Sequence, residues 1–278
     1  MKSGKKLGFI GAGNMAGALI QGVLARKLYR AGDIWVSDAV AAQRRLARRR
    51  HGVSAAKDNV DLVRGSQLVV LAVKPQTLPQ VLEEVRAAAN SRHLFVSIAA
   101  GVPLRRIEQG LGGGAVRVVR VMPNTPALLG RGMSVLVRGS AASARDLRRA
   151  MRIFRAVGDA MAFEDEGLLD AVTGLSGSGP AYVYRLAEAL IEGGVRQGLA
   201  AGVASRLVFQ TFDGASAMLR ETDQTPQQLR EMVSSPGGTT LAGLAELERA
   251  GFFAAAVAAV AAATARSREL GGGADGER

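Results

Sequence analysis

The sequence of 278 residues predicts an α/β domain with a doubly wound parallel sheet, followed by an all-α domain. Three observations support this fold class. Short apolar runs alternate with amphipathic segments through the first half of the chain, a glycine-rich turn follows the first run, and strand-like runs stop near residue 163. Hydrophobic residues make up 48% of the chain, which is enough for a sizeable core in each domain.

The strands of the first domain are predicted from short runs of branched apolar residues. We expect them at Leu7–Ile10, Ile34–Ser37, Leu68–Val73, Leu94–Ala99, Val116–Val121 and Ser134–Val137. A run such as Leu68–Val73, apolar throughout, is typical of a strand buried on both faces of a parallel sheet. Segments with helical spacing lie between these strands at Asn14–Lys27, Ala41–Arg50 and Leu78–Ala89, and another follows the last strand at Ala144–Val157. This alternation predicts a parallel sheet with right-handed crossovers.

The second half of the chain shows helical patterns only. Helices are expected at Glu166–Leu175, Pro180–Gly198, Val203–Thr222, Pro226–Val233, Thr240–Arg249 and Gly251–Glu269. The last residues show no periodicity and are typical of a flexible tail. We therefore predict a dinucleotide-binding domain at 1–163, a helical domain at 164–270 and a tail at 271–278.

The glycine-rich turn has the pattern G-x-G-x-x-A, from Gly11 to Ala16, directly after the first strand and at the start of a helix. In that context Gly11 makes the tight turn, Gly13 lets the backbone approach a pyrophosphate, and Ala16 lets the helix pack on the sheet. The start of the helix offers free N–H groups to the phosphates. The pattern predicts a Rossmann-type dinucleotide site.

The end of the second strand leaves the choice of dinucleotide open. An acidic residue there favours NAD by binding the ribose hydroxyls, whereas hydroxyl and arginine side chains favour the 2′-phosphate of NADP. This chain has Ser37 and Asp38 side by side, followed by Arg44 and Arg45. The arginines are equally consistent with a solvent-exposed helix face.

Composition excludes several classes of site. The chain has no cysteine and only two histidines, His51 and His93, so a disulfide framework, a thiolate metal site and a histidine-rich metal site are excluded. We predict no metal. The chain has a net charge of +12, with +16 in residues 1–165 and −4 in residues 166–278. This charge fits an anionic cofactor or a generic basic surface; with few aromatic residues and no recognition motif, we predict no nucleic-acid partner.

No segment predicts a membrane span. The longest apolar stretch, Phe252–Ala265, is shorter than the roughly 20 residues that a spanning helix needs, and it is typical of a buried or interfacial helix. We expect a cytoplasmic protein without a membrane partner.

The second half contains neither lysine nor histidine, since the last of each are Lys74 and His93. Oxidation of an alcohol usually needs such a group to take the proton, whereas a protonated imine is already electrophilic and mainly needs orientation. Ser234–Thr240, with two glycines and two threonines before a helix, suits a carboxylate or a capped turn between helices. Thr173–Pro180 fits either close backbone approach or a helix break, and Val121–Pro126 fits either a ligand site at a strand end or a proline turn.

These segments together resemble the pyrroline-5-carboxylate reductase family, from Leu7 to about Leu270. The similarity is carried by Gly11–Met15, Ala72–Pro75, Met122–Pro126, Gly174–Tyr182 and Ser234–Thr240 with the following Leu241–Leu244. The resemblance implies a Rossmann-type domain and an all-α dimerisation domain. It implies an oxidoreductase that acts on a C=N bond, reducing L-1-pyrroline-5-carboxylate to L-proline with NADPH, or NADH, in the last step of proline biosynthesis.

The resemblance also implies residue roles. The cofactor would be bound by Ile10, Gly11, Ala12, Gly13, Asn14, Met15, Ser37, Asn59, Ala72, Val73, Lys74, Pro75, Met122, Pro123 and Asn124, the last three flanking the nicotinamide. The substrate carboxylate would be held by Ser235, Gly237, Gly238, Thr239 and Thr240, with Ser235 and Thr240 as catalytic residues and Thr240 near the ring nitrogen. The helical domains would interlock into homodimers, and in some members into decamers.

The chain departs from some members of that family at one position. Where they have a glutamate near the substrate amine, this chain has Asp223, with Glu221 nearby. We include Asp223 among the substrate-binding residues. The alternatives are a β-hydroxyacid dehydrogenase, a reductase of another imine, or a regulatory protein that binds the dinucleotide without turnover. The missing lysine and histidine count against the first, and the intact Ser234–Thr240 segment counts against the last.

Overall fold

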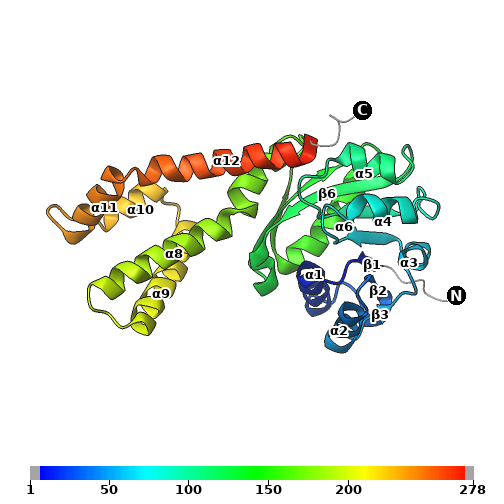
Figure 1. The fold of residues 1–278 in the computed structure, drawn as a ribbon, viewed down its shortest axis with the longest axis horizontal. Coiled ribbons are helices and arrows are strands. Elements are labelled where there is room, and N and C mark those ends of the chain that lie inside the picture. The colour runs from blue at the N-terminus through cyan, green and yellow to red at the C-terminus, as the bar shows by residue number, and fades with distance from the viewer. Residues whose placement is uncertain (1–6, 273–278) are drawn as a thin grey trace. The chain divides into compact units, whose positions relative to one another are not determined.

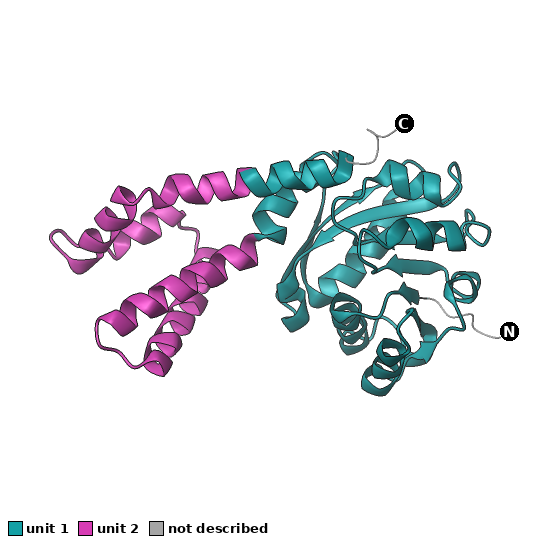
Figure 2. Cartoon of the chain, viewed as in Figure 1, with its two compact units in different colours: residues 1–178, 262–278 teal, residues 179–261 magenta. Residues whose placement is uncertain are grey.

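The structure is a computed structural model that describes residues 7–272 (Figure 1). The chain forms two compact units. The first comprises the described parts of Met1–Ser178 and Ala262–Arg278, and the second is Gly179–Ala261 (Figure 2).

The first unit is built on one eight-stranded sheet with the order β3-β2-β1-β4-β5-β6-β7-β8. The strands are β1 (Leu7–Ile10), β2 (Ile34–Ser37), β3 (Ser54–Ala55), β4 (Leu68–Leu71), β5 (Leu94–Ser97), β6 (Arg117–Pro123), β7 (Gly132–Arg138) and β8 (Gly158–Ala162). Every neighbouring pair is parallel except β6 and β7.

The predicted doubly wound parallel sheet is confirmed, except that β7 runs antiparallel to β6. The connection Asn124–Arg131 contains only the short 3₁₀ helix η2 (Thr125–Leu129), whereas a parallel return needs a crossover of a dozen or more residues. The sequence patterns also did not predict β3, which has two residues, or β8, whose sequence GDAMA is rich in small residues.

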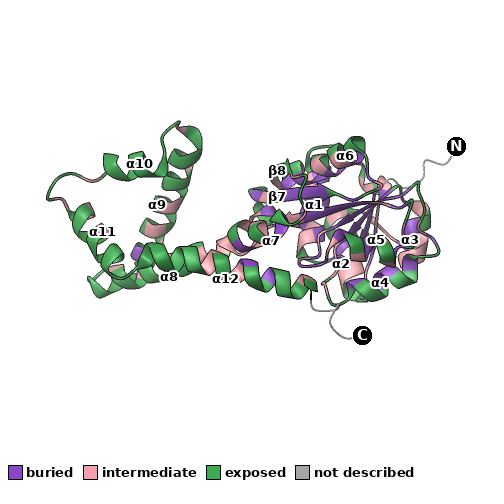
Figure 3. Cartoon of the chain, turned by 90° about the horizontal axis from the view of Figure 1, so that it is seen from above, coloured by how far each residue is buried: buried purple, intermediate pink, exposed green. Residues whose placement is uncertain are grey.

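Helices cover both faces of this sheet. They are α1 (Asn14–Ala25), α2 (Ala41–His51), α3 (Asn59–Gly65), α4 (Leu78–Val85), α5 (Leu104–Gly110), α6 (Ala144–Phe154) and α7 (Leu168–Val172), with η1 (Ala31–Asp33), η3 (Arg155–Val157) and the π-helix η4 (Thr173–Gly177). One core places Leu19 of α1 and Phe154 of α6 against the sheet, and the other uses Leu62 of α3 and Ile107 of α5. The central strands of the sheet are accordingly coloured as buried in Figure 3.

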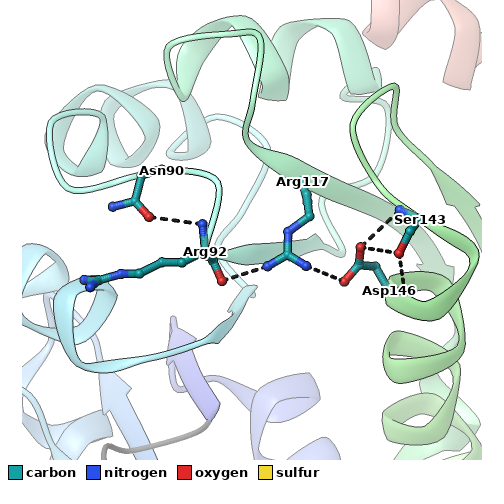
Figure 4. Close-up of polar contacts among 5 residues, drawn as sticks. All are labelled: Asn90, Arg92, Arg117, Ser143 and Asp146. Carbon is teal, nitrogen blue, oxygen red and sulfur yellow. Dashed lines mark hydrogen bonds and ion pairs between the residues drawn. The ribbon is translucent and has the colours of Figure 1, made fainter.

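A cluster of hydrogen-bonded polar side chains lies at the edge of the sheet where β5 and β6 begin (Figure 4). Arg117 donates to the carbonyl oxygen of Arg92 and to a carboxylate oxygen of Asp146, each at 2.7 Å, while the Arg92 N–H donates to Asn90 Oδ1. Asp146 also accepts from Ser143 at the start of α6 in a capping box. Burial would raise the pKa of Asp146, but the hydrogen bonds from Ser143 and the charge of Arg117 lower that pKa below its ordinary value.

The second unit is entirely helical. It contains α8 (Gly179–Arg196), α9 (Ala201–Glu221), α10 (Pro226–Met232), α11 (Thr239–Arg249) and the first part of α12 (Phe252–Gly272). Among its residues, all of which are described, only Ala204 is buried. Large apolar side chains such as Leu207, Phe209 and Phe253 are exposed. An all-α unit with so small a core of its own has apolar faces that need a partner.

The compact units divide the chain at a different place from the predicted domains. Leu169 of α7 lies in the core of the first unit, and Ser267 near the end of α12 donates to Asp170 at 2.6 Å. The limits 1–163 and 164–270 stay a prediction. Of the predicted tail 271–278, Gly271 and Gly272 end α12, and residues 273–278 lie outside the described residues.

Within residues 7–272, no single helix combines the length and hydropathy that crossing a membrane requires. Helices α11 and α12 meet that test only as a bent pair, by length and composition alone.

Candidate active site

The strand order places β1 between β2 and β4, which is the switch point of a doubly wound sheet. Since β1, β2, β4, β5 and β6 run in one direction, their carboxyl ends meet at the same edge. The predicted cofactor residues follow these ends: Gly11–Met15 after β1, Ser37 at the end of β2, Ala72–Pro75 after β4, and Met122–Asn124 at the end of β6. The fold thus brings them to one edge, where open α/β sheets bind ligands.

Gly11 makes the turn out of β1 in a conformation and a space that only glycine fits. Its φ is +96°, and a Cβ there would lie 2.5 Å from the carbonyl oxygen of Ala72. The Gly11 N–H donates to the Ser37 carbonyl at 2.7 Å, and the Ala72 N–H donates to the Ile10 carbonyl at the same distance. These bonds hold the ends of three strands together around the turn.

Gly13 precedes α1 and leaves room for a ligand. A Cβ at Gly13 would have no heavy atom within 4 Å, and no side chain caps α1 in the described residues. The N–H groups of the first turn, including those of Asn14 and Met15, therefore face this open space. Ala16 lies on the buried face of the same helix. This arrangement fits the pyrophosphate of a dinucleotide.

Asp38, which directly follows β2, stabilises the glycine turn after β1. Its carboxylate accepts from the Ala12 N–H and from the Val40 N–H, each at 2.8 Å. The guanidinium of Arg44 on α2 donates to the Asp38 carbonyl oxygen, so a positive charge lies beside this loop. Ser37, the last residue of β2, is 95% buried, with 5% of its surface exposed. Both carboxylate oxygens of Asp38 thus accept hydrogen bonds from backbone N–H groups of the protein itself.

Asn59 and Lys74 lie on neighbouring connections at the same edge. Asn59 is the first residue of α3, after β3, and its side-chain amide donates to Glu84 of α4 at 2.7 Å. Lys74 is exposed in the turn before α4, between the half-buried Val73 and Pro75.

Met122 and Pro123 end β6, and Asn124 follows them, next to the π-helix η4. The side-chain oxygen of Asn124 accepts from the Met133 N–H at 2.8 Å, and its nitrogen donates to the Ser176 carbonyl and hydroxyl oxygens at 3.2 and 3.3 Å. Gly177 lies so close to Met122 that a Cβ would be 2.3 Å from the Met122 methyl carbon. The glycine-rich segment at 173–180 thus does make a close approach, and sequence reasoning had not identified Met122 as its partner.

An ion pair that the sequence patterns did not predict supports this region. Arg120 of β6, which is buried, contacts Glu166 at 2.6 Å, and the Leu104 N–H donates to the same carboxylate oxygen at 2.7 Å. Glu166 thereby joins β6 and α5 to the segment that leads into α7. No sequence motif signals this pair, because its members come from distant parts of the chain.

The predicted substrate residues lie in the second unit, at the start of α11. Gly238 is the N-cap of this helix and donates its N–H to the Ser235 carbonyl at 2.9 Å, while Gly237 has a φ of +69°. No side chain caps α11 in the described residues, so the first-turn N–H groups of Thr239 and Thr240 remain available to an anion. Asp223 is exposed between α9 and α10. All these residues belong to the second unit, and all the cofactor residues to the first.

Comparisons with known proteins find matches over almost the whole chain. Residues 166–270 match the family model for pyrroline-5-carboxylate reductase dimerisation, and residues 6–101 match a model described as NADP oxidoreductase, coenzyme F420-dependent. The chain is 43% identical to a pyrroline-5-carboxylate reductase from Synechocystis, over 96% of this chain and 98% of that protein.

Solved structures give the same result. The pyrroline-5-carboxylate reductase from Coxiella burnetii has a TM-score of 0.89 and 35% identity, over 96% of this chain and 99% of that one. The enzyme from Plasmodium falciparum, solved with NADP bound, has a TM-score of 0.86 and 32% identity, over 96% and 98% of the two chains. Given this similarity over almost its entire length, the chain belongs to the pyrroline-5-carboxylate reductase family.

Proposed function

We propose that this chain reduces L-1-pyrroline-5-carboxylate to L-proline with NADPH, or with NADH, as the last step of proline biosynthesis. The observation that carries the proposal is the glycine turn at the switch point of the sheet, Gly11–Gly13, in a chain 43% identical to a reductase of that name. The uncapped start of α11 supports the substrate assignment.

The residues at the edge of the sheet fit a dinucleotide. Gly11 and Gly13 shape a turn that is open to a pyrophosphate. Ala72–Pro75, which follow the neighbouring strand β4, are proposed to line the other side of the cofactor site. Ser37 and Asn59 are proposed to bind the adenosine ribose, and Met122–Asn124 to flank the nicotinamide. When bound, the reduced nicotinamide supplies a hydride to C5 of the protonated imine, which becomes the secondary amine of proline without a further proton.

The start of α11 is proposed to hold the substrate carboxylate. The N–H groups of the first turn and the hydroxyl of Ser235 supply donors, and the positive end of the helix favours the negative charge. The Thr240 hydroxyl is proposed to accept from the ring N–H and so keep the proton on nitrogen. Asp223 adds a negative charge for the iminium. Orientation and electrostatics then provide most of the rate.

The apolar faces of the second unit support assembly into homodimers. Phe253 on α12 is 73% exposed, and Leu207 and Phe209 on α9 are more than half exposed. Large apolar side chains left exposed in this number on one unit favour an interface between proteins. We extend the proposal to a homodimer, with a decamer as the larger assembly, in the cytoplasm and without nucleic-acid or membrane partners.

Absorbance of NADPH and NADH, followed with purified protein and L-1-pyrroline-5-carboxylate, tests the proposal. Parallel reactions use 1-pyrroline-2-carboxylate, and a hydroxyacid in the oxidative direction. We expect oxidation of the reduced cofactor with the first substrate only. Binding of NADPH without turnover would overturn the substrate assignment and favour a silent dinucleotide-binding protein.

A further inference from the structure

The π-helix η4 is packed onto the end of β6, where Asn124 donates to Ser176 and Gly177 approaches Met122. The Ser178 N–H donates to the Thr173 carbonyl at 2.8 Å, the five-residue spacing of a π-turn, and the Thr173 hydroxyl donates to the Leu169 carbonyl at 2.7 Å. Leu169 is fully buried in the core of the first unit. Such single-turn widenings of a helix occur frequently at functional sites.

The side-chain amide of Asn124 bonds to the protein through both its oxygen and its nitrogen. Its oxygen accepts from the Met133 N–H, and its nitrogen, which has two hydrogens, donates to two oxygens of Ser176. A carboxamide has no further donor to offer a ligand. Asn124 therefore joins three segments, the end of β6, the start of β7 and the π-turn, at fixed distances from one another.

Gly177 sets the space available to the Met122 side chain. A Cβ at Gly177 would lie 2.3 Å from the Met122 methyl carbon and would displace it, whereas the next atoms, Thr173 Cγ2 at 3.7 Å and the Met122 sulfur at 4.0 Å, would be in ordinary contact. Methionine is flexible, so its methyl group takes the position that its neighbours allow. Here the neighbour is a backbone that Asn124 holds in place.

We propose that Asn124 is a positioning residue and that the contact between Gly177 and Met122 fixes the wall at the nicotinamide end of the cofactor site. This inference rests on the proposed function, because that function places Met122 beside the nicotinamide. Asn124 acts through the π-turn and through Met122. Disturbing the contact between Gly177 and Met122 therefore weakens binding of the nicotinamide and leaves binding of the adenosine end of the cofactor unchanged.

The test compares two ligands by calorimetry: NADPH, and 2′,5′-ADP, which has the adenosine end but no nicotinamide. Gly177→Ala is expected to weaken NADPH binding and lower kcat by roughly tenfold, since displacements of about 1 Å near reacting atoms carry effects of that size or larger. Binding of 2′,5′-ADP is expected to stay within about twofold of the unmodified protein. Gly32→Ala, where a Cβ meets no atom within 4 Å, is the matched control.

A double substitution separates this contact from a general loss of structure. In the Met122→Ala background the added methyl of Gly177→Ala has room, so its extra effect on NADPH binding is expected to fall below about twofold. Asn124→Ser removes both hydrogen bonds to Ser176. It is expected to weaken NADPH binding and to leave 2′,5′-ADP binding unchanged, as Gly177→Ala does. It replaces Gly177→Ala in the test if Gly177→Ala does not fold.

Three results would overturn the inference: Gly177→Ala behaving like Gly32→Ala, equal losses of NADPH and 2′,5′-ADP binding, or an unchanged effect in the Met122→Ala background. Failure of the proposed function is seen separately, as an unmodified protein that binds NADPH but does not oxidise it with L-1-pyrroline-5-carboxylate.

Discussion

The carboxylate of Asp38 accepts a hydrogen bond from the backbone N–H of Ala12, at 2.8 Å, in the middle of the glycine turn. Its other oxygen accepts from Val40, and Arg44 lies against its carbonyl oxygen. The acidic residue that by sequence pointed to NADH is thus directed at the protein's own backbone. The guanidinium beside it offers a charge that a 2′-phosphate would use. We therefore predict a preference for NADPH over NADH.

Replacing Arg44 by alanine therefore tests the cofactor preference. We predict that Arg44→Ala weakens binding of NADPH by about tenfold, the value of one charge-assisted contact, and changes NADH binding by less than about twofold. Arg45→Ala, an exposed arginine on the same helix, is the control and is expected to leave the ratio unchanged. Dissociation constants for both cofactors measure the effect. Equal losses for the two cofactors would contradict this role for Arg44.

The two glycines of the turn should respond differently to alanine. At Gly11, with φ at +96° and the Ala72 carbonyl 2.5 Å from the new Cβ, alanine should lower the melting temperature and abolish cofactor binding. At Gly13 the new methyl meets no protein atom, so we expect a stability loss below about 1 kcal/mol and a large loss of NADPH binding. Thermal unfolding and calorimetry separate the two. A Gly13→Ala variant with unimpaired NADPH binding would show that the pyrophosphate lies elsewhere.

Turnover should depend on Thr240 far more than on His93. Thr240 lies in the first turn of α11, whereas His93 is fully buried just before β5, at the edge opposite the carboxyl strand ends. We expect Thr240→Ala to lower kcat at least about a hundredfold, as loss of a site hydroxyl does, and His93→Ala to act mainly on stability. Steady-state kinetics of both variants provide the measurement. Similar kcat values for the two would exclude Thr240 from the site.

The burial of His93 predicts a dependence of stability on pH. Desolvation, together with the charges of Arg92 and Arg117, lowers the pKa of His93, although hydrogen bonds with Asn90 and Val63 oppose this. In the unfolded chain the imidazole takes a proton near pH 6.5, so the unfolded state binds the proton first as the pH falls. Stability should therefore be full above about pH 6.5 and decline below it, toward the folded-state pKa.

Urea unfolding of the unmodified protein and of His93→Gln, between pH 7.5 and 5, measures this slope. We expect the slope to flatten in the variant, which has no group that titrates at this position. Asp146 does not confuse the result, because its pKa is lowered and it titrates in more acidic solution. A slope that is the same in both proteins would assign the pH dependence to other groups.

The exposed apolar face of α12 predicts the effect of a charge there. Phe253→Glu places a carboxylate on a surface that a dimer would bury, at a desolvation cost of several kcal/mol for an unpaired ion. We expect a smaller particle by light scattering, while Gln80→Glu on the first unit leaves the mass unchanged. A variant of unchanged mass would place the interface on another face.

Sequence patterns predicted much of the fold because its strands are short apolar runs and its helices are amphipathic. They did not predict that β7 runs antiparallel to β6, which follows from a connection too short for a crossover. They did not predict α3 and α5, whose seven-residue lengths give periodicity little room. Element ends also moved by a few residues, as at α4, which ends at Val85 and not at Ala89.

The candidate site was predictable in position but not in detail. The glycine pattern and the strand ends place Gly11 and Met122 at one edge of the sheet, and the structure agrees. The engaged carboxylate of Asp38 and the π-turn above Met122 were not predictable, because they depend on which backbone groups meet in three dimensions. Residue type tells what a side chain can donate or accept, whereas the fold decides which partner it finds.

The decisive experiment incubates L-1-pyrroline-5-carboxylate with NADPH that carries deuterium at both C4 positions of the nicotinamide, followed by mass spectrometry and NMR of the product. Hydride transfer from the nicotinamide to C5 of the imine predicts L-proline with one deuterium, at C5, formed at the rate of NADPH oxidation. Proline without deuterium at C5, or NADPH that binds without product, would contradict it.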